Sequence, residues 1–186
     1  MTEPLGLESK TVRLVPYDPR WPTLFRAEAA RLATAVAAAG LCALNFEHVG
    51  STAVPGIAAK PILDLAAGRA SEMAAGVYVP LLEAAGWVYR GNSGLPGREF
   101  FRRGEPRSHH LHLVEYGGWH WRRYIGFRDA LRADATLRDA YAALKRDLAA
   151  QYPHDREAYI EGKTTFIETV LRAHGIARDR SSTDAP

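Results

Sequence analysis

Residues 48–64, HVGSTAVPGIAAKPILD, are the stretch that decides the fold of this 186-residue chain. A small Gly50-Ser51-Thr52 turn ends one apolar run, and Asp64 lies within the next one. A glycine turn after a strand exposes backbone N–H groups that attract phosphate oxygens. An aspartate on the neighbouring strand can hold a divalent cation that bridges the same phosphates. The pairing is therefore typical of phosphoryl or nucleotidyl transfer, while the structural alternative is a capped turn with Asp64 in an ion pair.

The composition is that of one globular domain. It is 47% hydrophobic and 24% charged, and its length suffices for one core. We expect a single domain over residues 1–177 and a disordered tail at 178–186. The sequence contains no apolar run of about 18 residues, which a membrane helix needs, and no secretory signal. Its single cysteine, Cys42, cannot form an internal disulfide. We therefore expect a cytoplasmic protein.

The charge of the chain bears on its partners. The net charge is +3 at pH 7, and the basic residues are spread out except in GREFFRRGEPRSHH at 97–110. So small an excess argues against nucleic acid as a partner. Two alternatives stay open for the basic stretch, a solvated face and a site for an anionic small molecule. We expect a nucleotide or phosphorylated metabolite as partner and no membrane, and the oligomeric state stays open.

Periodicity and turn signals predict an α+β fold. Strands are expected at 12–15, 42–49, 62–68, 87–90, 98–103 and 108–116, with the last two in a hairpin. A helix should begin after the Asp18-Pro19 cap signal and end at Gly40, and a second should cover 70–86 with a break at Pro80. From about residue 119 to 177 the chain should be helical, with caps at Asp134 and Asp155. This helical third should pack on a mixed sheet.

Several stretches, taken together, resemble the GrpB family of small nucleotidyltransferase-like proteins. The superfamily signature is a hydrophobic-Gly-[Gly/Ser] turn followed, after a gap, by Asp-x-[Asp/Glu] on a strand. The resemblance runs from about residue 15 to 173. It implies a nucleotidyltransferase-like mixed sheet flanked by helices, a fold that also occurs fused to dephospho-coenzyme A kinase, and it implies no particular reaction. The stretches are VPYDPRWPTLFRAEAARL, FEHVGSTAVPGIAAKPILDL, GREFFRRGEPRSHHLHLVE, FRDALRADATLRDAYAALKRDLA and YIEGKTTFIETVL.

This sequence departs from the superfamily pattern at one position. The pattern places two carboxylates at i and i+2, so that both face one side of a strand and share a metal pair. Here the stretch reads Asp64-Leu65-Ala66, so the second carboxylate is replaced by alanine. A two-metal site of the usual kind therefore lacks one ligand.

Two histidines are candidates to replace that ligand. His110 and His112 stand at i and i+2 of a predicted strand, so their imidazoles share one face. With Asp64 they form a catalytic and metal-ligating set, suited to Zn²⁺, Mn²⁺ or Fe²⁺ more than to Mg²⁺. The alternatives are phosphate binding or proton transfer by the histidines, or an ordinary half-buried strand. The cofactor expected from the resemblance is a divalent metal, Mg²⁺ or Mn²⁺, with Zn²⁺ as the variant that the histidines favour.

Further residues complete the expected site. Gly50, Ser51 and Thr52 should bind phosphate, together with Lys60, Arg98 and Lys163, the last of which resembles a recurring family lysine. His48 can face the pocket or the core, and Glu99 can replace the absent carboxylate or point to solvent. The structural alternatives for Lys60 and Lys163 are ion pairs with neighbouring carboxylates.

Two classes of function follow from these residues. The first is a metal-dependent transferase that acts on a nucleotide or another phosphorylated small molecule, with Asp64 holding the metal. The second is a non-catalytic binder of a nucleotide or metabolite, which Ala66 favours. A hydrolytic or ligase-like variant that uses the histidines also stays open.

Overall fold

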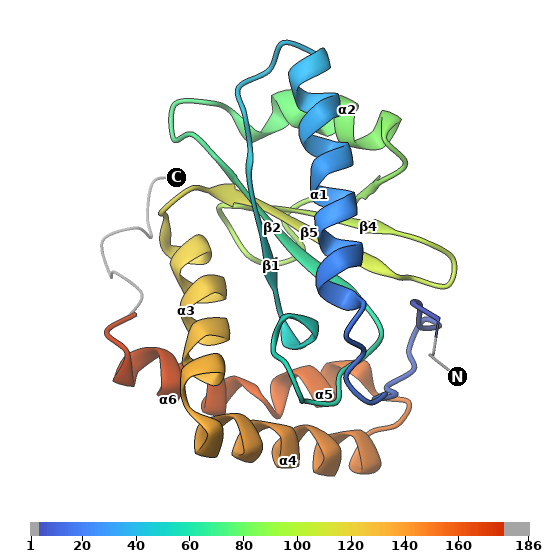
Figure 1. Ribbon diagram of the computed structural model, residues 1–186, viewed down its shortest axis with the longest axis vertical. Coiled ribbons are helices and arrows are strands. Elements are labelled where there is room, and N and C mark those ends of the chain that lie inside the picture. The colour runs from blue at the N-terminus through green and yellow to red at the C-terminus, as the bar shows by residue number, and fades with distance from the viewer. Residues whose placement is uncertain (1–3, 177–186) are drawn as a thin grey trace.

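A five-stranded mixed sheet in the order β1-β2-β5-β4-β3 forms the centre of the protein in a computed structural model, which describes residues 4–176 (Figure 1). Strands β2 and β5 pair in parallel, and the other neighbours pair antiparallel. Sequence analysis predicted this α+β architecture and the β4–β5 hairpin, and both are confirmed. The strands are β1 Asn45–Val49, β2 Leu63–Arg69, β3 Val88–Tyr89, β4 Arg98–Arg103 and β5 His109–Glu115.

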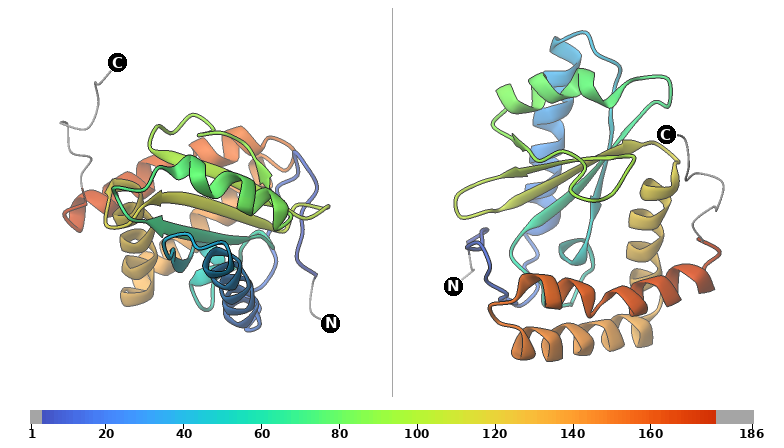
Figure 2. Two further views of the ribbon diagram at one scale, coloured as in Figure 1. Left: turned by 90° about the horizontal axis from the view of Figure 1, so that it is seen from above. Right: turned by 180° about the vertical axis from the view of Figure 1, so that it is seen from behind.

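Helices cover both faces and one end of the sheet. Helices α1 and α2 share a core with one face, and α3 packs on the other. Helices α4–α6 lie across the end of the sheet where β1 finishes and β2 begins (Figures 1 and 2). The helical third therefore caps the sheet as predicted. The helices are α1 Trp21–Ala38, α2 Val79–Ala84, α3 Trp119–Ala133, α4 Ala135–Gln151, α5 Arg156–Glu161 and α6 Thr164–Ala173, with short 3-10 turns η1 Ser51–Ala53 and η2 Ala75–Tyr78.

The alternation of side chains along β2 separates the core from the site. Leu63 and Leu65 are fully buried in the core beneath α1 and α2. Asp64 and Ala66 point to the opposite face because successive strand residues alternate. On that face Ala66 packs with Trp121 of α3. On this face β2 carries one polar residue, Asp64, followed by Ala66 and Gly68.

Three local predictions were wrong. Residues 12–15 form no strand, and only Val15 makes an isolated bridge, to Ala59 in the β1–β2 connection. Asp18 does not cap α1, because Arg20 is the N-cap residue and donates its backbone N–H to the Asp18 carboxylate. The helix predicted after Asp155 is divided into α5 and α6 around Gly162, where an added Cβ would lie 2.5 Å from a Leu148 methyl group.

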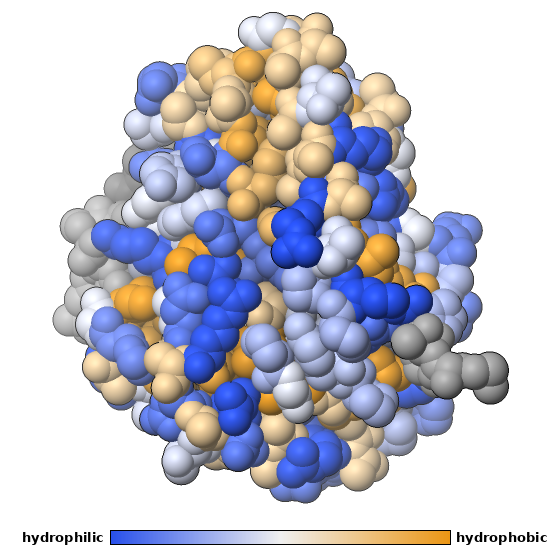
Figure 3. All heavy atoms as spheres, viewed as in Figure 1, coloured by the Kyte–Doolittle hydropathy of each residue, from blue (hydrophilic) through white to orange (hydrophobic). Residues whose placement is uncertain are grey.

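The remaining findings concern the surface and the chain ends. Among the described residues, no helix is long and apolar enough to cross a membrane. On the face seen in Figure 3, apolar residues gather over the alanine-rich end of α1 and elsewhere mix with polar ones. The expectation of a disordered tail at 178–186 lies outside the described residues.

Both predicted aspartate caps of the C-terminal helices form, and the cap of α4 offers a test of this part of the fold. The Asp134 side chain accepts a hydrogen bond from the Leu137 backbone N–H at 3.0 Å. We expect Asp134→Ala to lower the free energy of unfolding by about 1 kcal/mol, because a backbone donor loses its partner. Asp139→Ala, an exposed substitution within the same helix, should change it by less than about 0.5 kcal/mol. Urea denaturation measures both, and equal effects would contradict the capping role.

Candidate functional site

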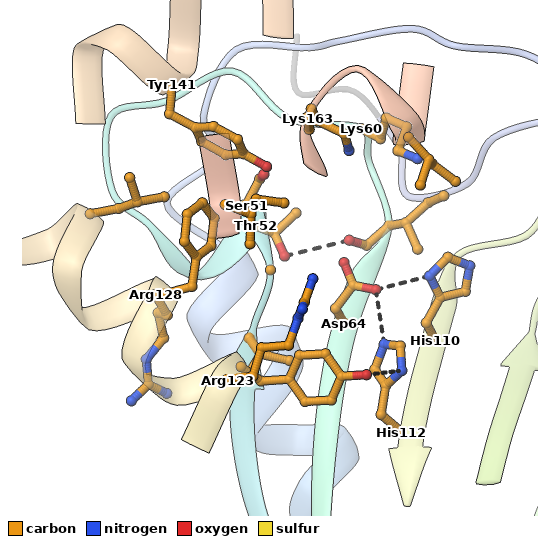
Figure 4. A pocket seen from close by; sticks show the side chains of 18 of the residues that line it. Ser51, Thr52, Lys60, Asp64, His110, His112, Arg123, Arg128, Tyr141 and Lys163 are labelled. Carbon is orange, nitrogen blue, oxygen red and sulfur yellow. Dashed lines mark hydrogen bonds and ion pairs between the residues drawn. The ribbon is translucent and has the colours of Figure 1, made fainter. Parts of the chain in front are cut away.

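A cavity of about 310 Å³ lies between the sheet and the helical cap (Figure 4). One wall of the cavity is formed by the start of β2, by β5 and by the η1 turn. The other walls come from the helices α3, α4, α5 and the start of α6. The cavity brings together eight of the predicted binding and catalytic residues, namely Gly50, Ser51, Thr52, Lys60, Asp64, His110, His112 and, from the helical cap, Lys163.

Asp64 is the centre of a hydrogen-bonded row that crosses the sheet. His110 is its register partner on β5, and His110 Nδ1 lies 2.9 Å from Asp64 Oδ1. His112 Nε2 approaches the same oxygen at a longer distance of 3.6 Å. The other ring nitrogen of His112, Nδ1, lies 3.4 Å from the Tyr124 hydroxyl of α3. Both histidines therefore converge on one carboxylate oxygen (Figure 4).

The charge states of this pair follow from burial and hydrogen bonding. Burial would raise the pKa of Asp64, but the contacts with His110 and His112 outweigh it and hold that pKa well below its usual range. Burial lowers the pKa of His110 to about 4, although Asp64 opposes the shift. At neutral pH Asp64 is therefore ionised and His110 is neutral. Because Asp64 then only accepts, His110 carries its proton on Nδ1 and has a lone pair on Nε2.

Gly50 makes room for the Asp64 carboxylate. Its backbone has a φ of +70°, a conformation that residues other than glycine rarely adopt. A Cβ at this position would lie 2.5 Å from Asp64 Oδ2. The second carboxylate oxygen therefore lies directly against the η1 turn, and the glycine serves this approach. The role that the structure gives Gly50 is steric.

Thr52 and Ser51 differ in their surroundings. The Thr52 hydroxyl is buried, lies 3.0 Å from His48 Nε2 and donates to the Ile62 carbonyl at 3.4 Å. It thus joins the end of β1 to the start of β2. The Ser51 side chain lies directly beside the Tyr141 hydroxyl of α4 and hydrogen-bonds with it (Figure 4). Of the two, Ser51 is the one placed to meet a ligand.

Cationic side chains gather on the side of the cavity formed by the helical cap. The ammonium groups of Lys60 and Lys163 lie 5.2 and 4.2 Å from the centre of the Tyr159 ring. Burial lowers the pKa of Lys60 to about 8. Burial, with repulsion from Lys60 and Lys145, lowers the pKa of Lys163 to about 7. Burial is the main cause of both low pKa values, and the neighbouring cations add to it.

Three predicted residues lie outside the cavity. His48 points to the opposite face of the sheet, where it stacks on Phe25 of α1 with ring centres 4.9 Å apart. Glu99 shares that face and pairs with the Tyr89 hydroxyl. Arg98 lies on the site face, but its guanidinium donates to the Asn92 and Ser93 carbonyls. His48 thus takes the core position, one of the two that the sequence left open. Glu99 neither replaces the absent carboxylate nor points to solvent, and Arg98 is held by loop carbonyls.

Sequence reasoning missed several residues of the lining. Arg123 and Tyr124 come from α3, Tyr141 from α4, and Arg156 and Tyr159 from α5. Tyr159 stands four residues before Lys163, and this spacing was a usable signal. No local spacing rule indicates that Arg123 and Tyr124 of α3 face the cavity.

The predicted metal ligands do not fit a metal ion in this arrangement. Within residues 4–176, no group of three or more His, Cys, Asp or Glu side chains is placed to hold one. Ala66, in place of the second carboxylate, is fully buried against Trp121.

Cationic side chains also fasten the helical cap to the β1–β2 connection. Arg128 donates to the His48 carbonyl at 2.9 Å and pairs with Glu47. Arg132 donates to the Ala53 carbonyl at 2.8 Å. Lys145, which is 1% exposed, donates to the Ala58 carbonyl at 2.5 Å. These contacts define an α+β protein whose cationic helical cap closes a cavity over a carboxylate–histidine pair.

Comparison with known proteins gives the family. The family model described as GrpB protein matches residues 11–173, and the chain belongs to this family. A structure titled "Crystal structure of conserved protein GrpB from Enterococcus faecalis" has a TM-score of 0.77 and 30% identity, and the match covers 87% of this chain and 96% of that one. The resemblance seen in the sequence is thereby confirmed at the level of the family and of its mixed α+β fold.

Two curated relatives are longer than this chain. "UPF0157 protein YqkA" of Bacillus subtilis is 35% identical over 161 residues, which are 86% of this chain and 46% of that protein. "Dephospho-CoA kinase" of Mycolicibacterium paratuberculosis is 30% identical over a match that covers 87% of this chain and 45% of that protein. The chain thus spans about half the length of each.

Substitution of Gly50 tests the close approach to Asp64. Gly50→Ala should lower the free energy of unfolding by at least about 1 kcal/mol more than Gly56→Ala. Both glycines have a positive φ, but a Cβ at Gly56 meets nothing within 4 Å, so the difference isolates the carboxylate contact. Chemical denaturation of the two variants gives the comparison. Equal destabilisation would show that the Asp64 contact does not matter.

The pH dependence of stability tests the buried lysine of α4. Burial lowers the pKa of Lys145 to about 7, from 10.5. Between these values the unfolded chain binds a proton that the folded chain does not, so stability rises with pH in this window. Wild type should therefore gain stability relative to Lys145→Met from pH 7 to 10. For the exposed neighbour Arg146→Met, the difference in the free energy of unfolding from wild type should stay nearly constant over this pH range. Parallel curves for Lys145→Met and wild type would contradict the burial of this charge.

Proposed function

We propose that the cavity binds a nucleotide or another phosphorylated small molecule and that the protein transfers a phosphoryl or nucleotidyl group from it. One observation carries this proposal: the ionised Asp64 carboxylate, paired with the neutral His110, lines the same cavity as several cationic side chains. The nucleotidyltransferase-like signature of the Gly50 turn and Asp64 supports it. The similarity to part of a relative named "Dephospho-CoA kinase" also supports it, over 45% of that protein.

The cationic wall is the part that would hold the phosphate. Lys60 and Lys163 lie on one side, and Arg123 and Arg156 complete the lining. An anion among these groups would favour their protonated forms and would relieve their mutual repulsion. Charge-assisted hydrogen bonds to phosphate are also stronger than neutral ones. Binding should therefore weaken as pH rises above about 8, where the lysines lose their protons.

The carboxylate–histidine pair is the part that would move a proton. In the proposed step, an acceptor hydroxyl or amine forms a bond to phosphorus, and the bond from phosphorus to its leaving group breaks with its electron pair. The proton of the acceptor passes to His110 Nε2, and Asp64 stabilises the resulting imidazolium, as in other carboxylate–histidine pairs. Burial disfavours that imidazolium in the empty cavity, but a bound phosphate would favour it. The phosphate and the proton would thus be held by adjacent groups.

A second candidate function is binding without catalysis. Its supporting observation is Ala66, which fills the position of the second carboxylate and packs against Trp121. Such a protein would keep the cationic wall and would hold its ligand unchanged. The two candidates differ in what Asp64 does. In the transferase Asp64 is needed for turnover, whereas in the binder it only orders the histidines.

Ligand binding and turnover can be measured on the same variants. Purified protein is tested by thermal shift with ATP, GTP, CTP, UTP and coenzyme A precursors, each with EDTA, Mg²⁺ or Mn²⁺. A ligand at about a hundred times its dissociation constant should add about 2.7 kcal/mol of stability. Lys163→Met should abolish the shift, and Arg146→Met, on the exposed side of α4, should retain it. Phosphorus NMR then follows the ligand that binds.

The outcomes separate the candidates. If the protein is a transferase, wild type should release pyrophosphate or phosphate. Asp64→Asn should still bind the ligand but should no longer release either product. Binding without any change in the phosphorus spectrum, with an added acceptor mixture, would favour the binder. No shift with any of the nucleotides would overturn the proposed ligand class.

A further inference from the structure

Three arginines meet at the edge of the sheet beyond His110. Arg102 is the register partner of His110 on β4, Arg107 follows the β4–β5 hairpin turn, and Arg156 begins α5. The N-terminal segment crosses the same place, because the Leu7 backbone bridges to Arg107 (Figure 2). Together with residues 9–10 and 154–157 the three arginines line a hollow of about 390 Å³. Arg102 and Arg107 come from the basic stretch that the sequence singled out.

Each of these guanidinium groups has a buried nitrogen without a hydrogen-bond partner among the described residues, and Arg107 is the most deeply buried of the three. Arg102 and Arg156 are half-buried, and Arg102 also lies over the Phe100 ring. Arg107 is 7% exposed, and its Nε and one Nη atom are buried with no hydrogen-bond partner among the described residues. The Nε atoms of Arg102 and Arg156 are in the same state. Burial, with repulsion from Arg156 and Arg102, lowers the pKa of Arg107 to about 10. A buried charge without a partner is costly, so such a group implies a counter-ion.

The carboxylates of the hollow do not supply that counter-ion. Asp155 uses its side chain to cap α5, where it accepts from the Glu157 and Ala158 backbone N–H groups. Glu157 is exposed. Within the described part of the chain, none of the three arginines forms an ion pair with a carboxylate. The hollow therefore has an excess of buried positive charge, and an external anion would satisfy it.

We propose that Arg102, Arg107 and Arg156 form a second anion-binding site, which takes a second phosphate group of the ligand. The guanidinium fork matches the oxygens of a phosphate, so three of them can surround one group. This inference rests on the proposed function. It narrows the substrate class to molecules with two phosphate groups or a phosphate chain.

Arg156 connects the two sites. It lines both this hollow and the cavity that holds Asp64. On the sheet, Arg102 and Asp64 flank His110 from opposite sides. His110 Nε2, on the side of the ring away from Asp64, is buried without a partner among the described residues. A ligand that reaches from the lysines to the arginines would pass this nitrogen, where the proposed proton transfer takes place.

Calorimetric titration with inorganic phosphate and pyrophosphate, in EDTA, tests the second site. Arg107→Met keeps the bulk of the side chain and removes its charge, so its thermal midpoint without ligand should equal or exceed that of wild type. We expect it to weaken pyrophosphate binding at least about tenfold. Arg156→Met serves as a second variant on another element. The matched control Arg146→Met lies on the exposed side of α4 and should change affinity less than about twofold.

Lys163→Met separates this inference from the proposed function. If pyrophosphate binds Arg107→Met and Arg156→Met as tightly as wild type, the second site is overturned. Loss of binding in Lys163→Met alone would then leave the first cavity as the phosphate site. Absence of pyrophosphate binding by wild type would also overturn the second site, while nucleotide shifts would still decide the proposed function. A larger loss for pyrophosphate than for phosphate in Arg107→Met is the result that supports two subsites.

Discussion

The Asp64 carboxylate and its contact with Gly50 are the constraint on which the site depends. One oxygen accepts from His110, and the other lies where a side chain at position 50 would have to be. The carboxylate is thus fixed from two sides, by a strand neighbour and by a turn without a side chain. Because the histidine contacts keep it ionised, Asp64 is a permanent negative charge beside a wall of cations. The arrangement orients the imidazole of His110 in the way that proton transfer requires.

The helical cap covers the cavity in which the Asp64 carboxylate lies. Arg128, Arg132 and Lys145 each reach a backbone carbonyl of the β1–β2 region, so the same connection that positions Gly50 also anchors α3 and α4. Buried donors that satisfy buried carbonyls order two parts of the chain at once. The anchoring brings Lys163 and Tyr159 over the sheet. A cavity with one ionised carboxylate and several cations then results, and its charge balance favours an anionic ligand.

Much of this arrangement could be predicted from the sequence, and the rest depends on tertiary contacts. The turn, Asp64, the paired histidines and both aspartate caps were visible because each has a local spacing rule. The positions of His48 and Glu99 could not be decided because the face of a strand residue depends on register, which local patterns do not set. Arg98 was misassigned because its guanidinium donates hydrogen bonds to the Asn92 and Ser93 backbone carbonyls instead. Arg156 and the lining tyrosines were missed because α3, α4 and α5 meet the sheet only when the helical cap packs on it. The excess charge around Arg107 emerges only when three distant arginines are brought together.

The most direct test of the account is the tautomer of His110, measured by long-range proton–nitrogen NMR at neutral pH. The account predicts a neutral ring that is protonated at Nδ1, with an Nε2 shift typical of an unprotonated nitrogen, and a change of that pattern in Asp64→Asn. A ring protonated at Nε2, or a fully protonated ring at pH 7, would contradict it. Either result would remove the lone pair that the proposed proton transfer uses, and with it the role assigned to the central pair of the site.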